Sequence, residues 1–270
     1  MPRGPASRRI ARAPPGNENP LMTETPGGRP VLGSPVLGSP VLGSTAPGST
    51  VLRDLLLVVL TVTTGCADAT CFLHLGQAFA SVITGNLVLL GLSAAKGTGA
   101  IAANSGIALG GYAAGVLAGA PIAREHEQRG PAASLWPGRV TACLAVELVV
   151  LAAFSAGWEV TGGRPAGAGR MLLLAAAGVA MGMQSAAVRR LGQFSTTYLT
   201  STLTGVLAGL ATAAKPDGLG RSLGVLAAIA AGAAAGAVIS DVAPALLPLL
   251  LLSPVTAVIA ASWALRDMGR

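Results

Sequence analysis

Residues 63–95 read TTGCADATCFLHLGQAFASVITGNLVLLGLSAA, and this stretch decides the fold. It is apolar enough to lie in a membrane, yet it contains a carboxylate, Asp68, and a polar break at Thr84-Gly85-Asn86. Charged and polar side chains are costly in lipid, so they usually face the interior of a helix bundle or an aqueous cavity. The stretch therefore predicts two helices of a multi-pass membrane protein, joined by a loop at His74–Gln77.

The composition of the whole chain supports this prediction. Of its 270 residues, 52% are hydrophobic and 11% are charged, and the mean hydropathy is +0.65. Soluble domains carry about 25% charged residues, so the shortfall is too large for a single anchor helix. The net charge of +7 suits basic membrane loops, and no clustered basic face indicates nucleic-acid binding. We expect an all-α integral membrane protein, a polytopic bundle of six to eight helices in the lipid bilayer.

Eight apolar segments are candidates for these helices, since a helix needs about 20 residues to cross the bilayer. The second segment is short. It either crosses a thinned bilayer with little tilt, or it is a half-helix that enters the membrane from the loop at His74–Gln77. A count of six spans results if the first and second segments, and likewise the fifth and sixth, are merged or include one segment that does not span. The segments are Leu55–Leu73, Phe79–Ala95, Ile101–Ile122, Val140–Trp158, Met171–Val188, Thr196–Ala214, Leu223–Ser240 and Val242–Leu265.

The chain divides into three parts. Residues 1–50 are rich in Pro, Gly and Ser and contain a VLGSP repeat, which predicts a disordered tail without a signal peptide. Residues 51–265 form the transmembrane domain, and 266–270 a short cytoplasmic tail. In an eight-span arrangement with a cytoplasmic N-terminus, the internal loops and flanks carry eight basic residues. The external loops carry five, Arg124, Arg129, Arg139, Arg189 and Arg190. This bias predicts a bacterial inner-membrane protein with both termini in the cytoplasm.

A second stretch, residues 181–214, repeats the pattern of the first: a Gly-bounded polar segment, Leu-Gly-Gln, and a Thr-rich step into an apolar helix. We therefore expect two related halves, about 53–158 and 171–265. Four spans in each half would give the halves the same orientation, and three would invert them. Small residues recur every fourth position and predict close helix packing; they are Gly111, Gly115 and Gly119 in the first half, and Gly224, Ala228, Gly232 and Gly236 in the second.

The candidate site residues are the polar groups inside these segments. Asp68 and Glu147 are the only acids well inside an apolar segment, which is typical of proton or solute binding. Two structural alternatives stay open: Asp68 caps the end of the first helix, and Glu147 is a neutral acid hydrogen-bonded to another helix. The proposed substrate- or proton-binding set also contains Thr84, Asn86, Gln184, Thr197 and Thr200. Their alternative role is hydrogen bonding within their own helices.

Known catalytic signatures are absent from the sequence. There is no GxSxG, no HExxH and no phosphate-binding loop, and the two histidines stand outside catalytic motifs. Cys66, Cys71 and Cys143 lack metal-binding spacing and are expected to be small buried hydrophobic residues. We therefore expect no enzyme activity, no catalytic residue, no cofactor and no metal site.

Several separated motifs resemble the YoaK-like family, bacterial multi-pass membrane proteins classed as a domain of unknown function. They are Gly65-x-x-Asp68, Thr84-Gly85-Asn86, Gly182-x-Gln184 and Thr196-Thr197-Tyr198-Leu199-Thr200, and the resemblance covers about Arg53 to Leu265. The family usually has TGT or TGN after this Leu, whereas Ser201 stands here in place of the glycine. The resemblance implies a multi-pass membrane fold and brings no substrate, cofactor or reaction.

Two functions are consistent with these features. The first is a secondary transporter or exporter of a small solute, proton-coupled through the intramembrane carboxylates. The second is a non-catalytic membrane assembly or regulatory subunit, which needs no site. Association into a homo-oligomer is left open.

Overall fold

The computed structural model describes Met1 and residues 47–124, 136–191, 196–211 and 219–267. Within these ranges, the side chains of residues 47–50, 196–202, 210 and 264–267 are not described. The predicted N-terminal tail therefore falls almost entirely outside the described residues, except that the first helix already begins at Pro47.

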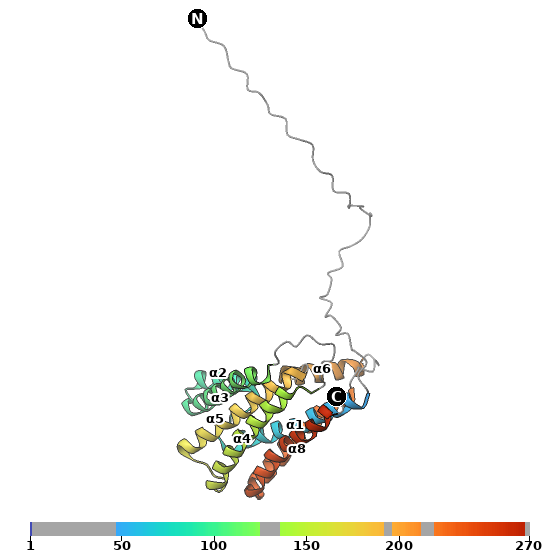
Figure 1. The fold of residues 1–270 in the computed structure, drawn as a ribbon. Helices are drawn as coiled ribbons and strands as arrows, with labels where there is room; N and C mark the ends of the chain where they lie inside the picture. The colour runs from blue at the N-terminus through green and yellow to red at the C-terminus, as the bar shows by residue number, and fades with distance from the viewer. Residues whose placement is uncertain (2–46, 125–135, 192–195, 212–218, 268–270) are drawn as a thin grey trace. The chain divides into compact units, whose positions relative to one another are not determined.

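The described residues form an all-helical fold, as predicted (Figure 1). All eight segments expected from the sequence are helices. In chain order they are α1 (Pro47–His74), α2 (Ile83–Lys96), α3 (Gly99–Ala123), α4 (Gly138–Val160), α5 (Gly167–Val188), α6 (Thr196–Ala211), α7 (Leu219–Val242) and α8 (Leu247–Asp267). Two single turns of 3-10 helix, Arg189–Leu191 and Pro244–Leu246, follow α5 and precede α8.

Six of these helices are long and apolar enough to cross a membrane, namely α1, α3, α4, α5, α7 and α8. Helices α2 and α6 have 14 and 16 residues. A helix rises 1.5 Å per residue, so about 20 residues are needed to cross the hydrocarbon. The second and sixth segments are therefore short helices between spans, and each half of the chain contributes three long helices.

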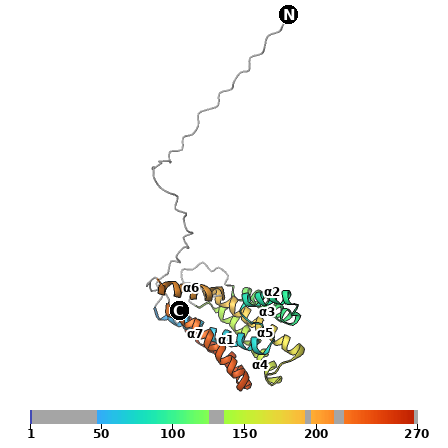
Figure 2. The ribbon, with the colours of Figure 1, turned by 180° about the vertical axis from the view of Figure 1, so that it is seen from behind.

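Two pairs of parallel helices pack together most extensively, α1 beside α7 and α3 beside α5 (Figure 1 and Figure 2). Both pairs meet at the predicted small-residue stripes. A Cβ atom at Gly115 would lie 2.1 Å from the carbonyl oxygen of Val179, and one at Gly232 would lie 2.2 Å from that of Val62. Because backbone approaches backbone at these points, the glycines are packing seams, which confirms their predicted role.

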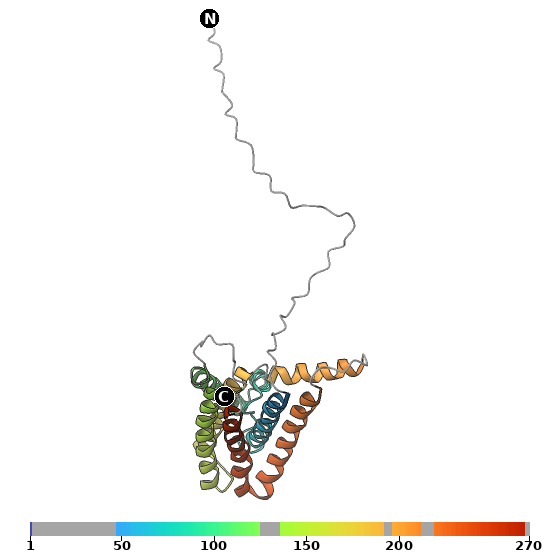
Figure 3. The ribbon, with the colours of Figure 1, turned by 45° about the vertical axis from the view of Figure 1, so that its right-hand side comes forward.

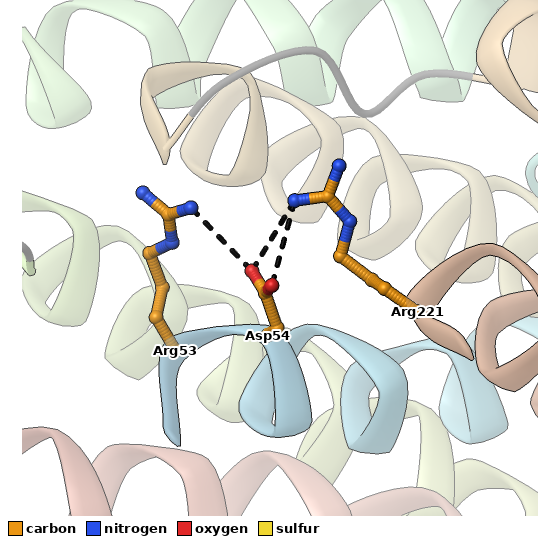
Figure 4. Close-up of polar contacts among 3 residues, drawn as sticks. All are labelled: Arg53, Asp54 and Arg221. Atoms are coloured by element: carbon orange, nitrogen blue, oxygen red, sulfur yellow. Dashed lines mark hydrogen bonds and ion pairs between the residues drawn. The ribbon is translucent and has the colours of Figure 1, made fainter. Parts of the chain in front are cut away.

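The contacts between helices fix their directions. We call the end of the bundle where α1 begins end A, and the end where it finishes end B. At end A, Asp54 of α1 accepts from Arg221 at the start of α7 (3.5 Å) and pairs with Arg53 (3.4 Å; Figure 4). At end B, the ring of His74 contacts that of Trp158, near the end of α4. Helices α1, α4 and α7 therefore run from A to B, and α3, α5 and α8 return.

The two short helices lie at opposite ends. Helix α2 follows the end of α1 and leads directly into α3, so it belongs to end B. Helix α6 connects the end of α5 to the start of α7 and lies across the bundle at end A (orange in Figure 3). Neither short helix carries the chain from one end of the bundle to the other.

This arrangement corrects the sequence-based placement of the loop charges. Helix α2 does not run from one end of the bundle to the other. Every loop between the second and sixth segments therefore lies at the opposite end from the one that the eight-span arrangement gave it. Four of the five arginines assigned above to external loops, Arg124, Arg139, Arg189 and Arg190, lie at end A with Arg53 and Arg221. The fifth, Arg129, lies outside the described residues. At end B the described basic residues are Lys96, Arg164 and Arg170. Of the basic residues whose side chains are described, six therefore lie at end A and three at end B.

Candidate polar sites inside the helix bundle

Asp68 lies on α1, about one and a half turns before the helix ends, and is buried. Both of its carboxylate oxygens are used. Oδ1 accepts from the backbone N–H of Ser81 (2.7 Å), and Oδ2 accepts from the Ser81 hydroxyl (2.5 Å). Ser81 stands two residues before α2, where backbone N–H groups lack partners within the helix. Asp68 therefore anchors the chain at the entrance to α2.

Two amide side chains hold the rest of this connection. Asn86 of α2 accepts from the backbone N–H of Phe79 (2.9 Å) and donates to its carbonyl oxygen (2.7 Å). Asn104 of α3 donates to the carbonyl oxygen of Gly76 (2.9 Å). Gly76 has φ +115°, and a Cβ there would lie 2.1 Å from the Asn104 amide nitrogen. We call these contacts of Asp68, Asn86 and Asn104 with residues 75–82 the loop clamp.

A second group of polar side chains joins three long helices. Thr64 of α1 donates to the amide oxygen of Gln184 on α5 (2.7 Å), and the Gln184 amide nitrogen donates to Oε1 of Glu147 on α4 (2.9 Å). Glu147 is fully buried, near the middle of α4. Its second oxygen, Oε2, is buried without a hydrogen-bond partner. We call Thr64, Gln184 and Glu147 the carboxylate chain.

The two groups differ in one respect that matters for chemistry. In the loop clamp each carboxylate oxygen of Asp68 has a donor, whereas the carboxylate chain ends on an oxygen with none. A buried oxygen without a donor is unfavourable by about 1–3 kcal/mol, and more if it is charged. Of the two buried acids among the described residues, Glu147 is therefore the one with an unused oxygen.

Comparison with known sequences places the chain in a family. Residues 56–262 match the family described as "Protein of unknown function (DUF1275)". The chain belongs to DUF1275. It is also 34% identical over 152 residues to the UPF0700 transmembrane protein YoaK of Bacillus subtilis (strain 168), a match that covers 56% of this chain and 64% of that protein. No solved structure matches the chain.

This membership confirms the resemblance drawn from the sequence motifs, and with the six long helices it identifies an integral multi-pass membrane protein. The match spans less than two thirds of the Bacillus protein. The family description names no activity for DUF1275.

The structure brings together only part of the predicted site. Glu147 and Gln184 are directly bonded, while Asp68 and Asn86 belong to the loop clamp. Thr84 is exposed on α2 and takes part in neither group. Thr197 and Thr200 lie on α6, where their side chains fall outside the described residues, so their roles stay predictions. Among the described residues, no hydrogen bond joins the loop clamp to the carboxylate chain.

Sequence reasoning missed three members of these groups, Thr64, Ser81 and Asn104. Thr64 stands four residues before Asp68, one turn earlier on α1, so the helical period was a usable signal. Ser81 and Asn104 gave no comparable signal, because their partners are 13 and 28 residues away in the sequence. Their contacts depend on the path of the loop.

A third polar contact lies at end B. His74 Nε2 is 3.0 Å from the hydroxyl of Ser240 and 3.3 Å from a carboxylate oxygen of Asp241, both on α7. The Asp241 side chain is 68% exposed, so these contacts lie at the surface end of the helices. Among the described residues there is no group of three or more His, Cys, Asp or Glu able to hold a metal ion.

Proposed function

We propose that this protein is a secondary transporter or exporter of a small solute, coupled to protons through Glu147. The observation that carries the proposal is the unpartnered Oε2 of Glu147. An acid buried among membrane helices commonly marks a proton or solute pathway. The carboxylate chain connects Glu147 through Gln184 to Thr64, so a change in its protonation acts on a contact between α4, α5 and α1.

The arrangement of the helices supports a transporter. If the two halves are repeats, α1 corresponds to α5, and these helices run in opposite directions. In the same way α3 corresponds to α7. The first helix of each half packs along the third helix of the other half, since α1 packs along α7 and α5 along α3. Two inverted halves that interlock are expected to pack in this way. Secondary transporters often use inverted repeats, with a binding site near the middle of the membrane at the repeat interface. The hydrogen bond from Thr64 to Gln184 joins α1 to α5.

The charge distribution supports a cytoplasmic end A. Lys and Arg concentrate in cytoplasmic loops, and the basic residues whose side chains are described favour end A by six to three. We therefore propose that the N-terminal end of α1 and the C-terminal end of α8 lie on the cytoplasmic side of a bacterial inner membrane. Catalytic activity and a resident cofactor are not part of the proposal.

The experiment is transport in reconstituted vesicles that contain a pH-sensitive dye. Small solutes are screened for movement of protons, and active solutes are retested with Glu147→Gln, Asp68→Asn and Thr84→Ala. We expect Glu147→Gln to abolish proton movement and Thr84→Ala to leave it unchanged. Asp68→Asn is expected to act through folding, so its activity should follow the amount of folded protein.

Proton movement that persists unchanged in Glu147→Gln contradicts the proposed role of Glu147. If the wild-type protein moves no proton with any solute but copurifies with a stoichiometric partner that depends on it, the assembly-subunit function is favoured instead.

A further inference from the structure

We infer that the ligand exchanged for the proton at Glu147 is a small monovalent cation, either an alkali metal ion or a small ammonium compound. This inference rests on the proposed function and adds the class of its substrate. It begins with the hydrogen bonds of the carboxylate chain. Gln184 uses its amide nitrogen for Oε1 of Glu147 and its amide oxygen for the Thr64 hydroxyl, so these bonds leave Oε2 as the free acceptor.

The free group is an acceptor, which selects the chemistry of its ligand. An ionised carboxylate buried in a low-dielectric interior is strongly disfavoured unless a positive charge or hydrogen-bond donors compensate it. A proton compensates it by forming the neutral acid. A cation does so by lying against Oε2, because a carboxylate oxygen is a hard ligand that suits such ions.

The protein itself supplies no cation at this level of the described helices. Every described Lys and Arg side chain lies in a loop or within the first or last two turns of a helix, and these residues are Arg53, Lys96, Arg124, Arg139, Arg164, Arg170, Arg189, Arg190 and Arg221. Glu147 makes no ion pair among the described residues, and the other titratable group nearby is Cys143, one turn earlier on α4. An anionic solute would thus meet a carboxylate with no opposite charge.

Asp68 does not offer a second site of this kind. Its two oxygens already accept from Ser81, and a cation there would have to displace the bonds that anchor α2. One carboxylate that holds either a proton or a monovalent cation exchanges them one for one. The charge on the buried site is the same in both occupied states, so neither form exposes an uncompensated carboxylate to the lipid interior.

The binding test does not depend on transport. Dicyclohexylcarbodiimide reacts with protonated carboxyl groups in apolar surroundings and adds its whole mass to the acid, which peptide mass spectrometry can locate. We expect labelling of Glu147 in the purified wild-type protein, and none at this position in Glu147→Gln. Sodium, potassium, methylammonium or tetramethylammonium, added as chloride salts, is expected to slow labelling about tenfold when about nine tenths of the sites are occupied.

The panel separates the two sources of a cation, since protection by sodium or potassium indicates a metal ion and protection by the ammonium compounds indicates an organic cation. N-methylglucamine chloride, whose cation carries a bulky polyol chain, controls for salt at equal ionic strength, and Asp68 labelling within the same protein controls for general unfolding. If acetate or phosphate protects Glu147 and no cation does, the inference is wrong. It is equally wrong if no cation changes the labelling rate.

Vesicle assays distinguish this failure from failure of the proposed function. If an anion gradient moves protons in the wild type but not in Glu147→Gln, the proposed transport function is supported and the inference of a cationic ligand is wrong. If cations protect Glu147 from labelling but no solute drives proton movement, the cation site is supported and proton-coupled transport is contradicted.

Discussion

Replacing Gly115 by alanine tests how closely α3 and α5 pack. The added Cβ would lie 2.1 Å from the carbonyl oxygen of Val179 and 2.8 Å from its carbonyl carbon. Ordinary contacts begin at 3.4 Å, so the helices must separate by about 1.3 Å at this point. A neighbouring side chain cannot relieve the clash by changing rotamer, because the atoms in contact belong to the backbone.

The separation weakens the whole seam. A gap of 0.5–1 Å removes about a quarter to a half of the dispersion energy of each affected contact. Overpacking of this kind costs about 1–3 kcal/mol, and we expect the free energy of unfolding to fall by that amount. Gly110→Ala on the same helix is the matched control, since a Cβ there meets nothing within 4 Å. Alanine also favours helix over glycine, so this control should be neutral or slightly stabilising.

The measurement is equilibrium unfolding in mixed micelles by titration with sodium dodecyl sulfate, followed by tryptophan fluorescence. Trp136 and Trp158 are fully buried and report on the unfolding of α4 and its neighbours. Equal midpoints for Gly115→Ala and Gly110→Ala would refute the close approach of the α3 and α5 backbones. A loss confined to Gly115→Ala supports it.

Three further predictions concern the loop clamp, the cysteines and the orientation. Asn86→Ala removes two hydrogen bonds to Phe79 and should lower the free energy of unfolding by about 1–3 kcal/mol in the same titration, whereas exposed Thr84→Ala should change it by less than about 0.5 kcal/mol; equal losses would contradict the clamp. The native cysteines should resist maleimide in the folded protein and react fully once it is unfolded, because all three are buried: Cys66, Cys71 and Cys143. Because the native cysteines do not react, single added cysteines report the orientation. Ala166→Cys at end B should react with a membrane-impermeant maleimide added to intact spheroplasts, whereas Val51→Cys at end A should react only after permeabilisation. The reverse pattern would place end A outside.

The sequence predicted the helices well because hydropathy and small-residue spacing are local properties. All eight segments form helices, and the stripes through Gly115 and Gly232 are packing seams. It predicted less of the candidate site. Asp68 and Glu147 looked equivalent as isolated acids, and the loop clamp now distinguishes them, since Ser81 satisfies both oxygens of Asp68.

The sequence by itself therefore determined the class of protein, the positions of its helices and the family of its motifs, because each depends on residues close together in the chain. Tertiary structure alone decided that α2 and α6 stay at the ends of the bundle. Their positions set the directions of α3, α4 and α5 and the end at which Arg124 and Arg189 lie. It also decided which acid keeps a free oxygen. Glu147 bonds to Gln184, 37 residues away, and Gln184 to Thr64, 120 residues away. Contacts across such separations arise only when helices pack, so local sequence patterns carry no record of them.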